Sequence, residues 1–402
     1  MIFISALILS SCGGDTAVKK QTTYFTTSSK GDYSDWTIVD NLLTAVWHVV
    51  NSSGAIDYSY NFTANCALPV DDGSRLCTIN PGATCTNGVA VCTDTPSGVI
   101  RIMEVPGVAL YALSNDDFQE QQLHVGFAKD SGACSQNVSG DYTMIHSGLG
   151  LRDNFGVYRS DTNFLNVLHA DFGFDTSSAL VTPTVKYNSS SEAESLTDLG
   201  CSDGVRVRRL GTDTIRAMLT QSGLFVLDLP AGQGGLLSFK TNRAAQIADF
   251  ANKNFGGVSF PDNSGPRFVK AVSSALTANR VGLAAGDGSS TINLRIMPLT
   301  TADLETSPGY PNFATSPTGY STPGSVLAAG YPAPKDIPGL FKLDGLTDAG
   351  RVILSAMEYN SKIIVIGMVY NHRTTSETNP ATGLHFTENN LYNTGNFILF
   401  EK

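Results

Sequence analysis

The chain is dominated by short runs in which apolar and polar residues alternate, and each run stops at Gly, Asn, Asp or Ser. In the segment 56–62 (IDYSYNF), every second residue is apolar or aromatic and the residues between them are polar. Alternation with a period of two places one set of side chains on one face of a strand. The β-branched and aromatic residues in these runs also favour strands. The sequence therefore predicts an all-β protein.

Pairs of such runs flank short turns, as antiparallel hairpins require. Three pairs stand out: 99–105 with 108–113, 214–219 with 224–229, and 352–357 with 363–370. The run Ile363–Ile366 is apolar at every position, which is typical of a strand that is covered on both faces. We therefore expect antiparallel sandwich or barrel modules.

Helical periodicity is scarce. The segment 242–254 (NRAAQIADFANKN) places small or apolar residues on one face, at positions 244, 247, 248 and 251. Asn242 is a suitable N-cap, and two glycines follow the segment at 256 and 257. The pattern predicts one short helix near 242–254.

Three segments resemble one another because each contains a hairpin and closes on Phe and Lys: 99–129 (GFAK), 205–240 (LSFK) and 352–402 (LFEK). A second similarity joins Gly31-Asp32-Tyr33-Ser34 to Gly140-Asp141-Tyr142-Thr143. A duplicated β-module of about a hundred residues explains both similarities, and so does chance likeness among hairpins. We expect β-modules at 33–135, 136–242 and 243–402, the first with a cysteine-rich loop.

The first residues carry the features of an export signal. Residues 2–9 (IFISALIL) are apolar, and this run is too short to span a bilayer, which needs about 20 residues. The following Leu9-Ser10-Ser11-Cys12 resembles the lipobox of bacterial lipoproteins, in which an apolar and two small residues precede an obligatory cysteine. The resemblance, which covers about a dozen residues, implies that residues 1–11 are a signal peptide and that Cys12 is acylated.

The resemblance also implies an address. Gly13, rather than aspartate, follows the cysteine, which resembles lipoproteins of the outer membrane. The implied partner is a lipid bilayer, in which acyl chains contribute about 0.8 kcal/mol per buried methylene. Residues 12–32 have few apolar residues and no period, and we expect a polar tether with a reach of roughly 25 Å.

Six cysteines remain once Cys12 is set aside. An exported chain meets an oxidising compartment, where disulfides persist. Six cysteines allow many pairings, and the sequence does not choose among them. None of the spacings fits the Cys-x(2–4)-Cys pattern typical of zinc sites, so we expect disulfides and no metal. The disulfide candidates are Cys66, Cys77, Cys85, Cys92, Cys134 and Cys201.

The segment 307–339 differs in composition from the rest of the chain. It is rich in proline and glycine, and Tyr310, Tyr320 and Tyr331 are interleaved with them. Long loops without regular structure are often functional. Two interpretations stay open: a loop whose tyrosines cover a sheet edge, and a surface whose tyrosines bind a ligand or partner.

No sequence motif of catalysis or cofactor binding occurs. The chain lacks Gly-x-Ser-x-Gly, His-Glu-x-x-His, a P-loop and a dinucleotide-binding glycine pattern. A nucleophilic set of Ser147, His169 and Asp171 is conceivable, because the last two share one face of a predicted strand. We assign no catalytic residue and expect no cofactor.

Charge restricts the partners. The formal net charge is −10 and charged residues make up 15% of the chain, so the basic surface that nucleic acids require is missing. The sequence thus favours a membrane-anchored lipoprotein of the cell envelope whose modules form a non-catalytic binding, adhesion or structural unit for an unidentified envelope or extracellular partner. The alternative is an envelope hydrolase acting on polysaccharide or peptide, which a concave site with His146, His169 and Asp171 would favour.

Overall fold

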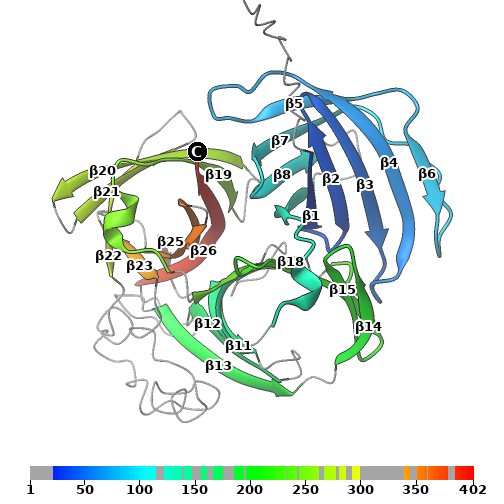
Figure 1. The fold of residues 1–402 in the computed structure, drawn as a ribbon. Coiled ribbons are helices and arrows are strands. Elements are labelled where there is room, and N and C mark those ends of the chain that lie inside the picture. The colour runs from blue at the N-terminus through cyan, green and yellow to red at the C-terminus, as the bar shows by residue number, and fades with distance from the viewer. Residues whose placement is uncertain are drawn as a thin grey trace, which may run out of the picture.

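The molecule is antiparallel β-structure throughout its described part, as the sequence predicts. It consists of two nine-stranded sheets and a closed eight-stranded barrel, in chain order (Figure 1). Short 3-10 turns are the helical elements among the described residues. The computed structural model describes residues 21–114, 122–137, 140–146, 155–160, 166–174, 185–193, 196–232, 234–241, 244–261, 267–277, 280–286, 292–298, 339–344, 351–359, 361–378 and 385–402.

Module 1 is the sheet formed by residues 22–128. Its strand order is β3-β2-β1-β9-β8-β7-β5-β4-β6, and an additional pairing of β3 with β4 turns the sheet back on itself. The predicted alternation is visible in β4, where Tyr60, Phe62 and Ala64 are buried. The strands are β1 (Thr22–Ser28), β2 (Tyr33–Val39), β3 (Leu42–Val50), β4 (Ile56–Cys66), β5 (Arg75–Ile79), β6 (Thr84–Asn87), β7 (Val99–Val105), β8 (Ala109–Ser114) and β9 (Leu123–Ala128).

Module 2 is the sheet formed by residues 140–240, and the 3-10 turn η1 (Ala133–Ser135) precedes it. Its order is β13-β12-β11-β10-β18-β17-β16-β15-β14, so the first strand pairs with the last. The strands are β10 (Gly140–His146), β11 (Phe155–Ser160), β12 (Asn166–Phe174), β13 (Val185–Ala193), β14 (Leu196–Ser202), β15 (Val205–Leu210), β16 (Asp213–Leu219), β17 (Leu224–Asp228) and β18 (Gly235–Lys240).

Module 3 is the closed barrel formed by residues 254–401. The apolar run Ile363–Ile366 is buried at every position: Ile364 and Ile366 join a cluster outside the barrel, and Ile363 and Val365 fill its interior. The strand is therefore covered on both faces, as predicted. The strands are β19 (Asn254–Pro261), β20 (Arg267–Thr277), β21 (Arg280–Gly286), β22 (Ile292–Pro298), β23 (Leu340–Asp344), β24 (Arg351–Tyr359), β25 (Lys362–Thr378) and β26 (His385–Glu401).

The three modules share one central core. It is an apolar cluster with members from every sheet, among them Phe25 and Tyr111 of module 1, Leu237 of module 2 and Phe400 of module 3. The rings of Tyr111 and Phe400 meet edge to face with their centroids 5.4 Å apart. Each buried side chain of this size contributes about 1.5–3 kcal/mol, so the contact among the modules stabilises the whole chain.

The predicted helix near 242–254 is wrong in extent. Its described residues, from 244 onward, contain the 3-10 turn η3 (Ile247–Phe250), closed by a capping box between Gln246 and Asp249. Ala245 N donates instead to the carbonyl of Ala356 on β24, and Phe250 is buried inside the barrel. Hydrogen bonds to the barrel and burial of Phe250 therefore override the helical periodicity.

The predicted tether is wrong beyond residue 21. Thr22–Ser28 forms β1, which pairs with β2 on one side and β9 on the other. Tyr24 and Phe25 are buried on opposite faces, in two different clusters. The threonine hydroxyls of this strand also have partners, since Trp36 Nε1 donates to Thr26 Oγ1 at 2.9 Å. The polar composition of this segment therefore did not indicate a central strand. Its hydroxyl groups are buried there because they form hydrogen bonds inside the protein.

The closing similarity has a counterpart in the topology. In chain order, β9, β18 and β26 are the last strands of their sheets, and each pairs with the first strand of its own sheet. Phe127, Phe239 and Phe400 lie on these strands and all join the central core. The Gly-Asp-Tyr similarity has no such counterpart, because Gly31 precedes a second strand whereas Gly140 begins a first strand.

Candidate functional site

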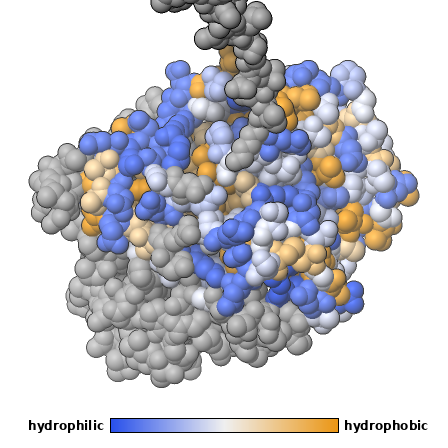
Figure 2. Space-filling model, in the orientation of Figure 1, coloured by the Kyte–Doolittle hydropathy of each residue, from blue (hydrophilic) through white to orange (hydrophobic). Residues whose placement is uncertain are grey.

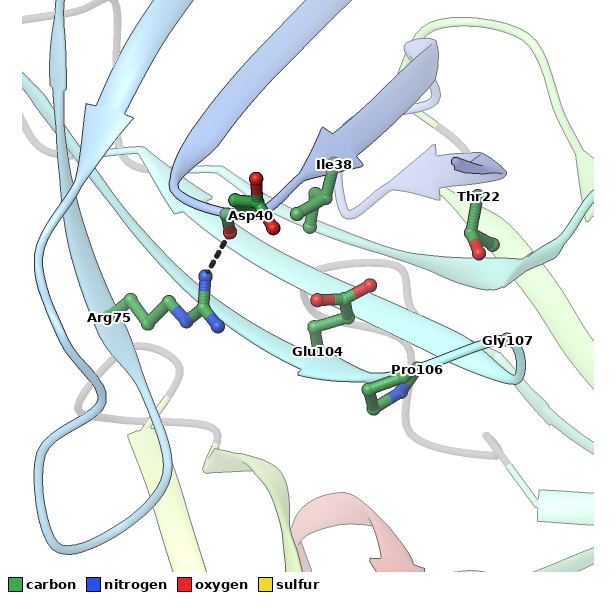
Figure 3. A pocket seen from close by; sticks show the side chains of 7 residues that line it. All are labelled: Thr22, Ile38, Asp40, Arg75, Glu104, Pro106 and Gly107. Atoms are coloured by element: carbon green, nitrogen blue, oxygen red, sulfur yellow. Dashed lines mark hydrogen bonds between the residues drawn. The ribbon is translucent and has the colours of Figure 1, made fainter. Parts of the chain in front are cut away.

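A pocket lies at one end of module 1, between the β2–β3 turn, β5 and the β7–β8 hairpin (Figure 3). Its volume is about 280 Å³. Charged side chains of both signs face it, together with a hydroxyl and two apolar groups. The lining residues are Thr22, Ile38, Asp40, Arg75, Glu104, Pro106 and Gly107.

Glu104 lines one wall of the pocket, and hydrogen bonds hold its carboxylate in place. The Tyr24 hydroxyl donates to Glu104 Oε1 at 2.7 Å, and the Gly107 N–H donates to that hydroxyl at 3.0 Å. Gly107 follows Pro106 in the tight turn of the hairpin and has a φ of 72°, which glycine adopts freely. Burial raises the pKa of the Tyr24 phenol above its usual value, so the hydroxyl stays a donor.

Arg75 forms the other wall. Its Nη1 donates to the carbonyl of Asp40 at 2.7 Å. Asp40 lies in the two-residue turn between β2 and β3 with a φ of 56°, a conformation that aspartate tolerates in turns. In the described part of the chain no ion pair joins Arg75 to Glu104. A fixed cation and a fixed anion therefore face one hollow without neutralising each other.

The sequence interpretation singled out none of these pocket residues. Thr22 fell in the predicted tether, and Arg75 in the cysteine-rich loop. The signal that was available is Glu104, one of two charged residues, with Arg101, in the run VIRIMEV. Such a residue in a half-buried strand needs a polar partner, and Tyr24 supplies it from a strand 80 positions away.

All six disulfide candidates are paired in the structure. The bonds are Cys66–Cys77, Cys85–Cys92 and Cys134–Cys201. The first joins opposite residues of β4 and β5, and the second closes a loop beside β6. The third ties η1 to β14, which stands at one end of the strand order of the module 2 sheet. Two of the three bonds thus close short loops of module 1.

These two short loops carry exposed apolar side chains. Among the described residues eight large hydrophobic side chains are exposed, and five of them lie between paired cysteines. The side on which Figure 1 places β4 and β6 shows such apolar groups in Figure 2. The five are Leu68 (76% exposed), Val70 (56%), Leu76 (50%), Val89 (73%) and Val91 (74%).

A buried polar junction joins module 1 to module 2. Arg216 on β16 donates to the carbonyl of Gly54 at 3.0 Å and stacks on the Tyr33 ring at 4.2 Å. Its Nη1 also lies 3.7 Å from Asp228 Oδ2, and Thr27 Oγ1 donates to Asp228 Oδ1 at 3.0 Å. Burial raises the pKa of Asp228, and Arg216 opposes that shift. The junction is closed and structural.

Two Ser–His pairs occur in module 1, and both are part of its packing. His124 Nδ1 lies 2.7 Å from Ser34 Oγ, and the imidazole is fully buried between Trp36 and Trp47. Burial lowers the pKa of His124 to about 3. In the second pair, His48 Nδ1 lies 2.7 Å from Ser59 Oγ. His48 also stacks on Tyr33, and burial lowers its pKa to about 4.

Acid is expected to destabilise the protein through His124. A folded-state pKa below the model value of 6.5 means that its contribution to stability is present above pH 6.5 and is lost as the pH falls. When the pH falls from 7 to 4, the free energy of unfolding of the wild type is expected to drop by about 3 kcal/mol more than that of His124→Leu. Urea titrations at both pH values measure the two changes.

Asp32 provides a control, because its effect on stability changes with pH in the direction opposite to that of His124. Burial raises its pKa to about 6, so its contribution is present at low pH and is lost as the pH rises from 3.8 to 6. Asp32→Asn is therefore expected to lose more stability than the wild type on acidification. Identical pH profiles for wild type and His124→Leu would contradict the assignment to His124.

The remaining predicted sites fall where the structure gives no side-chain description. Cys12 and the loop tyrosines Tyr310, Tyr320 and Tyr331 lie outside the described residues, as does Ser147. His146, His169 and Asp171 lie on strands β10 and β12, whose backbone pairing is described while these side chains are not.

Among the described residues, no group of three His, Cys, Asp or Glu side chains is placed to hold a metal ion. Within the same residues, no helix has the length and apolar character needed to span a membrane.

Comparison with known proteins adds little. No protein-family model matches the chain, and no curated protein matches it. A protein of unknown function from the DUF3598 family of Nostoc punctiforme is 9% identical, with 68% of this chain and 99% of that chain covered and a TM-score of 0.22. Isotype 1 transferrin binding protein B from serogroup B Neisseria meningitidis is 10% identical, with 92% and 66% covered and a TM-score of 0.20. At these scores neither likeness carries an argument about this chain.

Proposed function

We propose that the protein is a lipid-anchored protein of the cell envelope that binds an apolar protein surface through the two disulfide-closed loops of module 1. The binding role rests on one observation, the gathering of exposed apolar side chains between paired cysteines. The anchor rests on the lipobox resemblance at Cys12.

The exposed side chains are unfavourable in an isolated protein. Leaving a leucine or valine in water forgoes about 1.5–3 kcal/mol relative to burying it, and exposed apolar groups that cluster commonly mark interaction sites. Leu68 and Val89 lie in loops that the disulfides hold in place, so neither loop is free to fold inward. A loop that is already ordered loses little entropy when it binds.

The second loop suits the type of partner proposed particularly well. The loop closed by Cys85–Cys92 (CTNGVAVC) has no charged residue, and Val89 and Val91 are its largest side chains. Both loops are attached to β4: β5 pairs with its C-terminal end, at the Cys66–Cys77 bond, and β6 pairs nearer its N-terminal end. A partner that contacts both loops would therefore run along the edge of module 1 at β6.

The anchor would hold module 1 close to a bilayer. β1 begins at Thr22, so residues 12–21 would form the connection. Ten residues span at most roughly 35 Å even when fully extended, so the anchor would keep module 1 near the bilayer. The three disulfides support the same address, because they persist in oxidising compartments.

Photo-crosslinking in intact cells tests the binding role. A photo-reactive residue at Leu68 or Val89 is expected to give a discrete adduct with a partner protein, and Cys85→Ser/Cys92→Ser is expected to weaken the adduct at Val89. Leu199, which is 46% exposed on module 2, serves as the matched control site. Equal adducts at Leu199, or none at either loop, would overturn the proposal.

The anchor is tested on the same cells by fatty-acid labelling. The wild-type protein is expected to carry the label and to stay with the membranes, and Cys12→Ala is expected to lose both. Equal labelling of the two proteins would remove the anchor and leave the binding role to stand on the crosslinks alone.

A further inference from the structure

The pocket of module 1 takes Arg75 from the segment closed by Cys66–Cys77, but none of the five exposed apolar side chains lines it, and it has chemistry of its own. We infer that it binds a small zwitterion, an amino acid or the end of a short peptide, with the ligand's carboxylate on Arg75 and its ammonium group on Glu104. This inference does not depend on the proposed function.

Both charged groups are held ready for a ligand. A guanidinium carries five N–H donors, and Arg75 uses one of them on the Asp40 carbonyl, which fixes its direction. The remaining donors match the two oxygens of a carboxylate. The Tyr24 hydroxyl binds Oε1 of Glu104 and leaves further acceptor positions on that carboxylate. Figure 3 shows both side chains directed into the same hollow.

Arg75 and Glu104 do not neutralise each other. Long side chains of opposite charge on one surface commonly form an ion pair, but in the described part of the chain no ion pair joins Arg75 to Glu104. The hydrogen bonds from Tyr24 and to Asp40 hold the two groups on separate walls. A ligand with both an anionic and a cationic group satisfies both walls at once.

The size of the pocket limits the ligand. Pockets for drug-sized molecules measure about 300–1,000 Å³, and this pocket of about 280 Å³ lies just below that range. An amino acid or dipeptide fits, whereas an oligosaccharide or a longer peptide exceeds the space. Ile38 and Pro106 offer apolar contact for the aliphatic part of such a ligand.

Ligand-detected saturation-transfer NMR on the full chain tests the inference with lysine, lysinamide, which lacks the carboxylate, and Nα,Nε-diacetyl-lysine, which lacks both ammonium groups. Losing one charge-assisted contact is expected to weaken binding about tenfold or more. Arg75→Gln should therefore weaken lysine but leave lysinamide unchanged. Glu104→Gln should weaken lysine but leave the diacetylated compound unchanged.

Two control variants separate charge from folding. Tyr24→Phe keeps the Glu104 charge and removes the hydrogen bond that positions it, so its loss of lysine affinity should be smaller than that of Glu104→Gln. Arg101→Gln removes a neighbouring arginine that does not line the pocket and should leave affinity unchanged. Thermal unfolding of each variant shows whether it is folded.

The probes also identify the source of the ligand. Tighter binding of lysine than of the dipeptide Ala-Lys indicates a free amino acid, and the reverse indicates a peptide end. Equal binding of lysine and lysinamide to the wild type, or no binding of any probe at millimolar concentrations, would overturn the inference. Crosslinking at Val89 is unaffected by either result.

Discussion

Replacing Arg216 with methionine is expected to lower the free energy of unfolding by about 4 kcal/mol. The Arg216 side chain is only 8% exposed at the junction of modules 1 and 2. It contacts the Gly54 carbonyl, the Tyr33 ring and Asp228. Methionine fills part of the volume but leaves a buried carbonyl and a buried carboxyl without their partner, and such groups are costly.

The loss of stability caused by Arg216→Met is expected to grow as the pH rises. Arg216 opposes the rise in the pKa of Asp228 that burial causes, so removing it raises that pKa further. A raised folded-state pKa contributes stability at low pH that is lost as the pH rises. The loss caused by Arg216→Met is therefore expected to be larger at pH 8 than at pH 5, measured by urea unfolding.

Arg101 is the matched control for Arg216. It also stacks on an aromatic ring, that of Phe268 at 4.7 Å, and pairs with Asp72, but 43% of its side chain is exposed. Water screens such contacts, so Arg101→Met is expected to change stability by about 1 kcal/mol or less. The double variant Arg216→Met/Asp228→Asn should recover part of the loss. Equal losses for Arg216→Met and Arg101→Met would refute the role of the junction.

Removing the Cys134–Cys201 bond is the second large effect. The cysteines are 67 positions apart, and in the chain-entropy model the bond restrains the unfolded chain by about 4 kcal/mol. The bond also fastens β14, which pairs with β15 alone among the described strands, to η1. Cys134→Ser/Cys201→Ser is therefore expected to lower the free energy of unfolding by about 4 kcal/mol in urea titrations.

The bond Cys85–Cys92 provides the comparison. Its cysteines are seven positions apart, and the same model gives about 2 kcal/mol. The ranking of the two double variants therefore measures how far each bond restrains the unfolded chain. A larger loss for Cys85→Ser/Cys92→Ser than for Cys134→Ser/Cys201→Ser would contradict this explanation.

Local features of the fold were predictable because they depend on neighbouring residues. Alternation in 56–62 predicted β4, and the Pro-Gly turn at 106–107 predicted the β7–β8 hairpin. The helix near 242–254 failed because its periodicity competes with a hydrogen bond to Ala356, more than a hundred residues away. The tether failed at Thr22–Ser28 because its polar side chains find partners on other strands.

The pocket lay beyond sequence reasoning for the same reason. Its charged groups, Arg75 and Glu104, are ordinary strand residues until the sheet closes. Their fixed positions depend on Asp40 and Tyr24, which reach them from distant parts of the chain. No spacing in the sequence indicates such a meeting, because it is set by strand order and register.

The amino-acid sequence was enough to predict an all-β chain of antiparallel hairpins with six cysteines available for disulfides, because alternation and turn chemistry act over a few residues. The pairing of the cysteines, the central place of β1, and the core that three sheets share around Phe25, Leu237 and Phe400 follow from the tertiary fold. These outcomes depend on contacts between residues far apart in the chain, which form only when closed sheets bring them together.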